Sequence, residues 1–100
     1  MQKTTKSTGG TSFHDDVFSA SVNDLIQILG EPDYVDNSGE DKVNFEWEME
    51  TEDGEVFTVY SWKEYRPIKK SEIIEWHIGG LSGAITSKAL DEIVEALHNL

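Results

Sequence analysis

The chain contains no cysteine, only two prolines and no long apolar run. Without cysteine, disulfide bonds and zinc–thiolate sites are excluded, and a reducing cytoplasm is the simplest compartment. No apolar stretch approaches the roughly 18 residues that a membrane-spanning helix needs. Lys3 and Lys6 are followed by glycine and threonine instead of an apolar stretch, so no signal peptide is expected. The sequence therefore predicts a cytoplasmic protein that does not bind membranes.

Basic residues are scarce as well. Eight Lys and Arg stand against twenty Asp and Glu, which gives a formal net charge of −12. The acids are concentrated between residues 15 and 64, whereas residues 1–14 carry two lysines and no acid. Such a chain is repelled by nucleic acid, and basic molecules are its natural partners. Acidity that serves only solubility is the alternative.

Patterns typical of catalytic and metal sites are also missing. His14-Asp15-Asp16 lacks a second histidine at ligand spacing, and residues 33–41 have the composition of a calcium loop without its spacing. Gly79-Gly80 is not accompanied by the lysine and hydroxyl residue of a P-loop. We expect no catalytic residue, no metal, no cofactor and no enzymatic activity.

The patterns that are present predict one α+β domain over residues 13–100, preceded by a flexible tail over residues 1–12. Amphipathic or β-branched runs predict strands and helices in the order β-α-β-β-β-α. The strands are expected at 11–20, 43–50, 56–65 and 72–80, and the helices at 21–30 and 86–100. An antiparallel sheet of about four strands with two helices packed on one face is the expected architecture.

Spacing also predicts the caps and the core. Ser21 is expected to cap the first helix, and Thr86 or Ser87 the second. In "EWHIGG", Trp76 is expected to point into the core and His77 to the opposite face. The expected core residues on the other elements are Leu25, Leu29, Phe45, Trp47, Met49, Leu90, Ile93, Val94 and Leu97.

The hairpin around Asp53-Gly54 allows two registers. A two-residue turn would pair Glu52 with Glu55, whereas a three-residue loop with Gly54 in the left-handed conformation would pair Thr51 with Glu55. We favour the second, because facing glutamates are destabilising. It places Thr58, Tyr60 and Trp62 on the same face as Glu46, Glu48 and Glu50. The alternative is that Tyr60 and Trp62 belong to the core.

The order of these motifs resembles a family of small uncharacterised proteins encoded by tailed bacteriophages. The resemblance runs from about residue 11 to residue 80. Its marks are Gly30-Glu31-Pro32, Trp47, Asp53-Gly54, Tyr60, Trp62-Lys63 and Trp76-His77-Ile78-Gly79-Gly80. It implies a phage accessory protein made in the cytoplasm of a bacterial host, and it implies no catalytic residue.

Two functions are favoured, and an enzyme ranks third because no catalytic pattern is present. The first is an acidic accessory protein that binds and modulates a basic host protein, with Glu46, Glu48 and Glu50 forming a row that resembles the charges of a nucleic acid. The second is a protein that binds or sequesters a small molecule such as a nucleotide, with Tyr60, Trp62 and His77 stacking on a base. A homodimer would favour the second function, because two copies could build a pocket that one small domain lacks.

Overall fold

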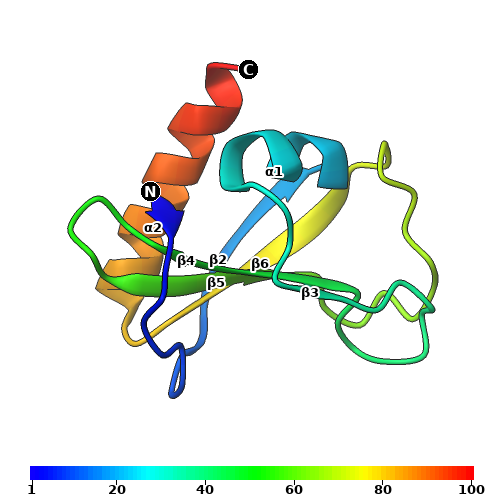
Figure 1. Cartoon of the computed structure of the whole chain (residues 1–100), viewed down its shortest axis with the longest axis horizontal. Coiled ribbons are helices and arrows are strands. Elements are labelled where there is room, and N and C mark those ends of the chain that lie inside the picture. The colour runs from blue at the N-terminus through cyan, green and yellow to red at the C-terminus, as the bar shows by residue number, and fades with distance from the viewer.

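The computed structural model describes residues 1–100 and has two layers, a sheet and a pair of helices (Figure 1). Both helices lie on the same side of the sheet, and no helix covers the other side. Neither helix is long and apolar enough to cross a membrane. The elements are β1 (Gln2–Lys3), β2 (Ser12–Ala20), α1 (Val22–Leu29), β3 (Tyr34–Val35), β4 (Phe45–Glu50), β5 (Val56–Tyr60), β6 (Ile74–Gly80) and α2 (Gly83–His98).

The sheet is antiparallel and six-stranded, in the order β1-β4-β5-β6-β2, and β3 also pairs with β4. The α+β class and the two helices on one face are confirmed, but the expected count of about four strands is too low. The two additional strands, β1 and β3, are two residues long, too short to show any periodicity in the sequence. Both pair with the outer edge of β4, one near each end.

The two edge strands of the sheet differ in how their outer edges are covered. The edge of β4 is covered by β1, by β3 and by the side chain of Asp33, whose Oδ2 accepts the backbone N–H of Glu48 at 2.7 Å. The outer edge of β2 has no strand beside it. β2 carries a register shift between Phe13 and Val17, where Asp15 has a φ of 72°. Bulges of this kind oppose strand addition at an exposed edge.

The β4–β5 hairpin has the three-residue register. Glu46 pairs with Tyr60 and Glu48 with Thr58, so the alternative that pairs Glu52 with Glu55 is wrong. The N–H of Thr51 donates to the carbonyl of Glu55 at 2.9 Å, and Gly54 has a φ of 82°. This register points Glu46 and Tyr60 away from the helices.

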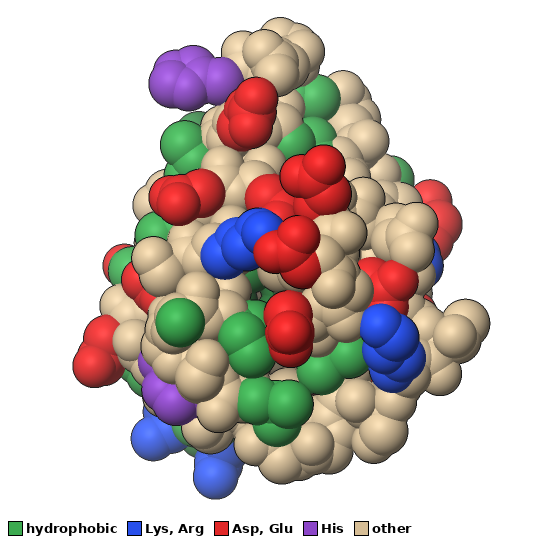
Figure 2. Space-filling model, turned by 90° about the vertical axis from the view of Figure 1, so that its left-hand side faces the viewer, with side chains coloured by type: hydrophobic (Ala, Val, Ile, Leu, Met, Phe, Trp, Pro, Cys, Tyr) green, Lys and Arg blue, Asp and Glu red, His purple; other side chains and the backbone are tan.

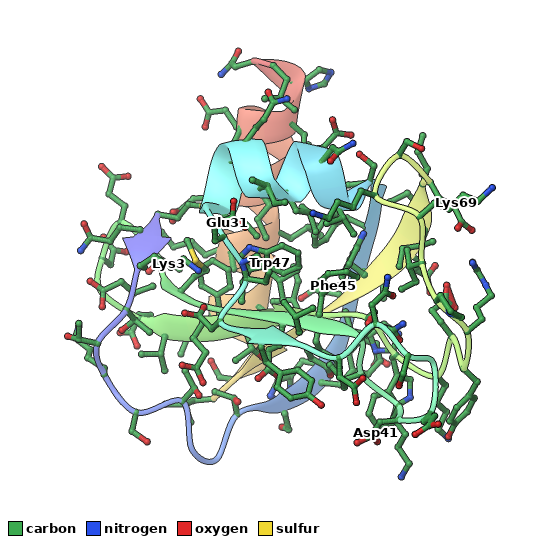
Figure 3. All side chains as sticks on the ribbon, turned by 45° about the vertical axis from the view of Figure 1, so that its right-hand side comes forward. Lys3, Glu31, Asp41, Phe45, Trp47 and Lys69 are labelled. Atoms are coloured by element: carbon green, nitrogen blue, oxygen red, sulfur yellow. The ribbon has the colours of Figure 1, made fainter.

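The core lies between the sheet and the helices and is centred on two tryptophans. The rings of Trp47 and Trp76 are both fully buried and meet edge to face, with centroids 5.5 Å apart. Each indole N–H finds a backbone acceptor: Trp47 donates to Gly30 at 2.8 Å, and Trp76 to Ala20 at 2.9 Å. Figure 3 shows Trp47 and Phe45 in the layer between the sheet and α1. The first bond ties the end of α1 to β4, and the second joins β6 to the last residue of β2, next to the Ser21 cap.

The first helix matches its prediction, and the second begins earlier than expected. The Ser21 hydroxyl accepts the N–H of Asp24 at 3.1 Å, which is the expected cap. The cap of α2 is Ser82, four to five residues before the predicted candidates. Glycines at 79, 80 and 83 obscured this start, because glycine has a poor helix propensity.

One expected core residue of α2 is misplaced. Val94 is 43% exposed, whereas Ala89 and Ile93 are fully buried. The buried stripe runs through Thr86, Ala89 and Ile93, which are spaced three and four residues apart, and Val94 lies outside it. Leu90 and Leu97 are partly buried at its border.

The first twelve residues, expected to form a flexible tail, are placed against the sheet. After β1 the chain descends past the edge of β4 and loops beneath the sheet, on the side away from α1 and α2 (Figure 1). We call Gln2–Thr8 the N-terminal segment. Its flexibility stays a prediction, but the side chains that it contacts bear on the function.

Candidate functional site

The sheet face that carries no helix, called the open face below, presents a continuous row of side chains across five strands. Strand pairing places Tyr34 opposite Glu46, Glu46 opposite Tyr60, Tyr60 opposite His77 and His77 opposite Val17. Facing residues of an antiparallel sheet lie about 4.5–5.5 Å apart, so neighbours in this row are in contact range. Five elements that are distant in the sequence therefore supply one surface.

Four aromatic rings gather in the middle of the open face, and we call them the aromatic cluster: Phe13, Tyr60, Trp62 and His77. His77 is at its centre. The Phe13 ring stacks on it at 4.3 Å, and the rings of Tyr60 and Trp62 lie 5.6 and 6.4 Å away. Phe13 is 40% exposed and Trp62 is 39% exposed. Aromatic rings this exposed are typical of residues that become buried on binding.

A loop in an unusual conformation displays Trp62. Lys63 and Tyr65 have φ values of 56° and 52°, in the left-handed region that residues with a Cβ rarely occupy. The ammonium groups of Lys42 and Lys63 lie 5.8 and 5.6 Å from the centre of the Trp62 ring. These are cation–π distances, so the tryptophan already interacts with two positive charges.

Glu46 pairs with Tyr60 across β4 and β5, which places its carboxylate next to the aromatic cluster. The environment of this carboxylate opposes its ionisation. Burial raises the pKa of Glu46 above its ordinary value, and the carboxylates of Glu48 and Asp33 raise it further. Burial also raises the pKa of Tyr60, and Glu46 adds to that shift. No cation is bonded to Glu46 in the structure. A positive charge placed there would relieve an unfavourable arrangement.

The two remaining glutamates of the predicted row are engaged by the N-terminal segment. The Glu50 side chain accepts hydrogen bonds from Gln2 at 2.6 Å and from Thr4 at 2.9 Å, and Lys6 lies 3.4 Å away. These donors lower the pKa of Glu50 below its ordinary value. Glu48 accepts a bond from Thr8 at 3.1 Å. Glu50 is buried, so the row presents only Glu46 and Glu48 to solvent.

A glycine shapes the open face beside the cluster. A Cβ added to Gly79 would lie 2.6 Å from the Thr58 hydroxyl and 3.4 Å from the Tyr60 ring. Real Cβ atoms do not approach that closely, so any side chain at this position would displace its neighbours. Gly79 lets Thr58 and the Tyr60 ring lie flat against the sheet.

A second acidic surface lies elsewhere, over α2 and the β4–β5 turn (Figure 2). Glu92 accepts the N–H of Glu52 with both oxygens at 3.2 Å, and Lys88 pairs with Asp53. Asp91 and Glu95 are exposed on the same helix. The charge of the chain is therefore divided between two surfaces, which the sequence alone did not separate.

The other residues considered in the sequence have local structural roles. His14 Nε2 lies 3.1 Å from the Gly80 carbonyl, and Asp16 accepts a 2.6 Å bond from the Thr86 hydroxyl. His77 has aromatic neighbours and no hydrogen bond to a carboxylate or hydroxyl group. Its surroundings thus suit ring stacking and cation contacts better than proton transfer.

The cavities of the molecule lie away from the open face. The largest has a volume of about 390 Å³ and is lined by Met1, Ile28, Glu52, Glu92, Glu95, Ala96 and Asn99. The others lie between β2 and α2 and beside the start of β1. No member of the aromatic cluster lines any of them, so the cluster forms a surface instead of a pocket.

All six predicted site residues point to the open face, but they form two groups. Glu46, Tyr60, Trp62 and His77 adjoin one another at its centre, while Glu48 and Glu50 lie toward the N-terminal segment. Phe13 and Tyr34 were not predicted as site residues. The strand that carries Phe13 was expected, but its place beside β6 was not, and Tyr34 lies in a loop without strand periodicity.

Comparisons with family models, with curated proteins and with solved structures find no match to the chain. The resemblance to tailed-phage proteins stays a prediction.

Proposed function

We propose that the chain is an interaction protein whose open face binds a basic segment of a partner protein. The observation that carries this proposal is the position of Glu46, a partly buried carboxylate without a cation, beside an exposed aromatic cluster. Carboxylates and aromatic faces both attract lysine and arginine side chains. Aromatic anchors also supply much of the binding energy of protein interfaces.

The shape of the surface supports a macromolecular partner. Small molecules bind mostly in concave sites, whereas the aromatic cluster lines no cavity. The net charge of −12 supports a basic partner, because it would steer a basic protein toward the chain. The resemblance to phage proteins makes a bacterial host protein the partner that we propose.

In this proposal, the nucleic-acid-like row of carboxylates is shorter than the sequence predicts. Glu46 and Glu48 present two carboxylates, and Glu50 is added only when the N-terminal segment moves away. Asp33 lies next to this row and pairs with Lys3 at 2.9 Å. The row is thus a minor part of the surface, and the aromatic cluster is its main anchor.

A nucleotide-binding role is the second candidate, and one observation favours it. Lys42 and Lys63 flank the Trp62 ring, so a base stacked nearby would find two positive charges for its phosphates. A second copy of the chain would have to supply the missing pocket wall.

Capture from bacterial lysate with chemical cross-linking tests the proposal. The wild-type chain is compared with Glu46→Gln/Trp62→Ala and with the matched α2 variant Asp91→Asn/Val94→Ala, which removes one carboxylate and one exposed apolar side chain elsewhere. We expect a basic protein that the wild type and the α2 variant capture and the open-face variant loses.

Two results would contradict the proposal. Equal capture by all three chains would show that the open face does not take part. Loss with the α2 variant alone would place the interface on the second acidic surface. A co-purifying nucleotide that depends on Trp62, with no captured protein, would establish the second candidate.

A further inference from the structure

The N-terminal segment runs along the edge of β4, with Lys3 beside the end of α1, and continues onto the open face, and its side-chain contacts are almost all polar. Lys3 Nζ pairs with Asp33 at 2.9 Å and donates to the Glu31 carbonyl, and Lys6 Nζ donates to the Gly54 carbonyl at 2.8 Å. Figure 3 shows Lys3 beside Glu31. The segment is therefore a basic, hydroxyl-bearing strand on an acidic surface.

The segment covers carboxylates that the proposed interface would use. Its threonines at 4 and 8 donate to Glu50 and Glu48, and Lys6 lies 3.4 Å from Glu50. The segment thus occupies, within one chain, the place that a basic partner would take beside Glu46. Besides these bonds and the short β1 pairing, its start is anchored by Met1, which packs against the core and whose ammonium group pairs with Glu92 at 3.1 Å.

Beyond the anchor at Met1, the energetics favour release of the segment. Residues 2–8 contain no apolar side chain, so no hydrophobic burial holds them in place. Lys6 is 57% exposed and Lys3 is 39% exposed, and ion pairs at such sites are weak and screened by salt. Segments with few buried contacts open at the lowest free-energy cost.

We infer that the N-terminal segment is an autoinhibitory strap, which closes the Glu48–Glu50 half of the open face and competes with the basic partner. The inference rests on the proposed function. Displacing the strap exposes Glu50 and extends the presented row from two carboxylates to three. It also frees the edge of β4 at Met49 and Glu50, where β1 is paired.

A pair of charge-matched variants tests the strap. Lys3→Ser/Lys6→Ser removes its two ion-pairing side chains, and Lys69→Ser/Lys70→Ser removes two exposed lysines that have no partner. The probe is a synthetic octalysine peptide, titrated at low salt. Both variants make the chain equally more acidic, so their difference reports the strap alone.

We expect Lys3→Ser/Lys6→Ser to bind octalysine about three- to tenfold more tightly than the control variant, since each weak pair contributes a few-fold. Adding Glu50→Gln should abolish the gain. Amide hydrogen exchange of residues 2–8, measured without peptide, should accelerate in the strap variant only. Equal affinities of the two lysine variants, or unchanged exchange, would overturn the inference.

The outcome separates the strap from the proposed function. The exchange measurement needs no partner, and the capture comparison keeps Lys3 and Lys6 in every chain. If capture does not depend on Glu46 and Trp62, but exchange of residues 2–8 accelerates in the strap variant, the proposed function alone is refuted. If capture does depend on Glu46 and Trp62, but the two lysine variants do not differ, the strap alone is refuted.

Discussion

Glu46 and Tyr60 lie directly opposite each other across the β4–β5 pairing, and burial raises the pKa of both. Their side chains share the open face with no cation bonded to Glu46. A carboxylate in this position lowers stability when it ionises. Residues that bind a partner often carry such a cost, because the free protein lacks the group that would compensate for it.

The first prediction concerns the stability effect of Glu46. Its pKa is raised in the folded state, so ionised Glu46 costs stability at neutral pH, and the cost is relieved as pH falls through that raised pKa. Glu46→Gln should therefore melt at a higher temperature than the wild type near pH 7. The difference should shrink in acid. Thermal melting across this range measures it, and a less stable Gln variant at neutral pH would contradict the assignment.

Glu50 should behave in the opposite way. Hydrogen bonds from Gln2 and Thr4 lower its folded pKa, so ionised Glu50 stabilises the fold above its unfolded pKa, and this contribution is lost as pH falls through the folded pKa. Glu50→Gln should lower the melting temperature near pH 7 and have little effect in strong acid. The same melting series serves as the measurement, with Glu46→Gln as the internal contrast.

Gly79 should be essential to the open face because of one contact. Gly79→Ala puts a Cβ 2.6 Å from the Thr58 hydroxyl, so it should destabilise the chain and move the His77 and Tyr60 ring resonances in NMR spectra. Thr58→Ala removes that oxygen. The double variant should recover most of the stability lost by Gly79→Ala, and a double variant as unstable as the single one would refute this explanation.

Trp47 is the core residue with the largest expected effect. Trp47→Ala leaves a large cavity beside Trp76 and loses the bond to Gly30, so it should cost about 3–5 kcal/mol of unfolding free energy. Trp47→Phe keeps much of the volume and should cost clearly less. Chemical denaturation measures both, and a Trp47→Ala chain with unchanged stability would contradict the described core.

Local patterns allowed much of the fold to be predicted. The register of the β4–β5 hairpin follows from Gly54 and from the repulsion that facing glutamates would suffer, and the cap of α1 follows from Ser21. The start of α2 was missed, because its glycine-rich approach resembles a loop. β1 and β3 were missed, because a two-residue strand is defined only by its partner.

The candidate site could be predicted only where it depends on one hairpin. Strand alternation placed Glu46 and Tyr60 on one face. The same rule placed the side chain of His77 on the other face of the sheet from that of Trp76. Phe13 reaches His77 only through the pairing of β2 with β6, a contact between residues 64 positions apart. The hydrogen bonds from the N-terminal segment to Glu50 likewise depend on tertiary contacts that no local pattern encodes.

The most direct test of the central claim is the association rate of the captured partner with two charge-matched variants. Glu46→Gln/Glu48→Gln removes two carboxylates from the open face, and Asp91→Asn/Glu95→Gln removes two from α2. Measured over a range of salt concentrations, the open-face variant should associate more slowly and lose most of the salt dependence, because nearby charges steer the encounter. The α2 variant should stay close to the wild type. Equal slowing by both variants, or no slowing by either, would contradict the assignment of the open face as the binding surface.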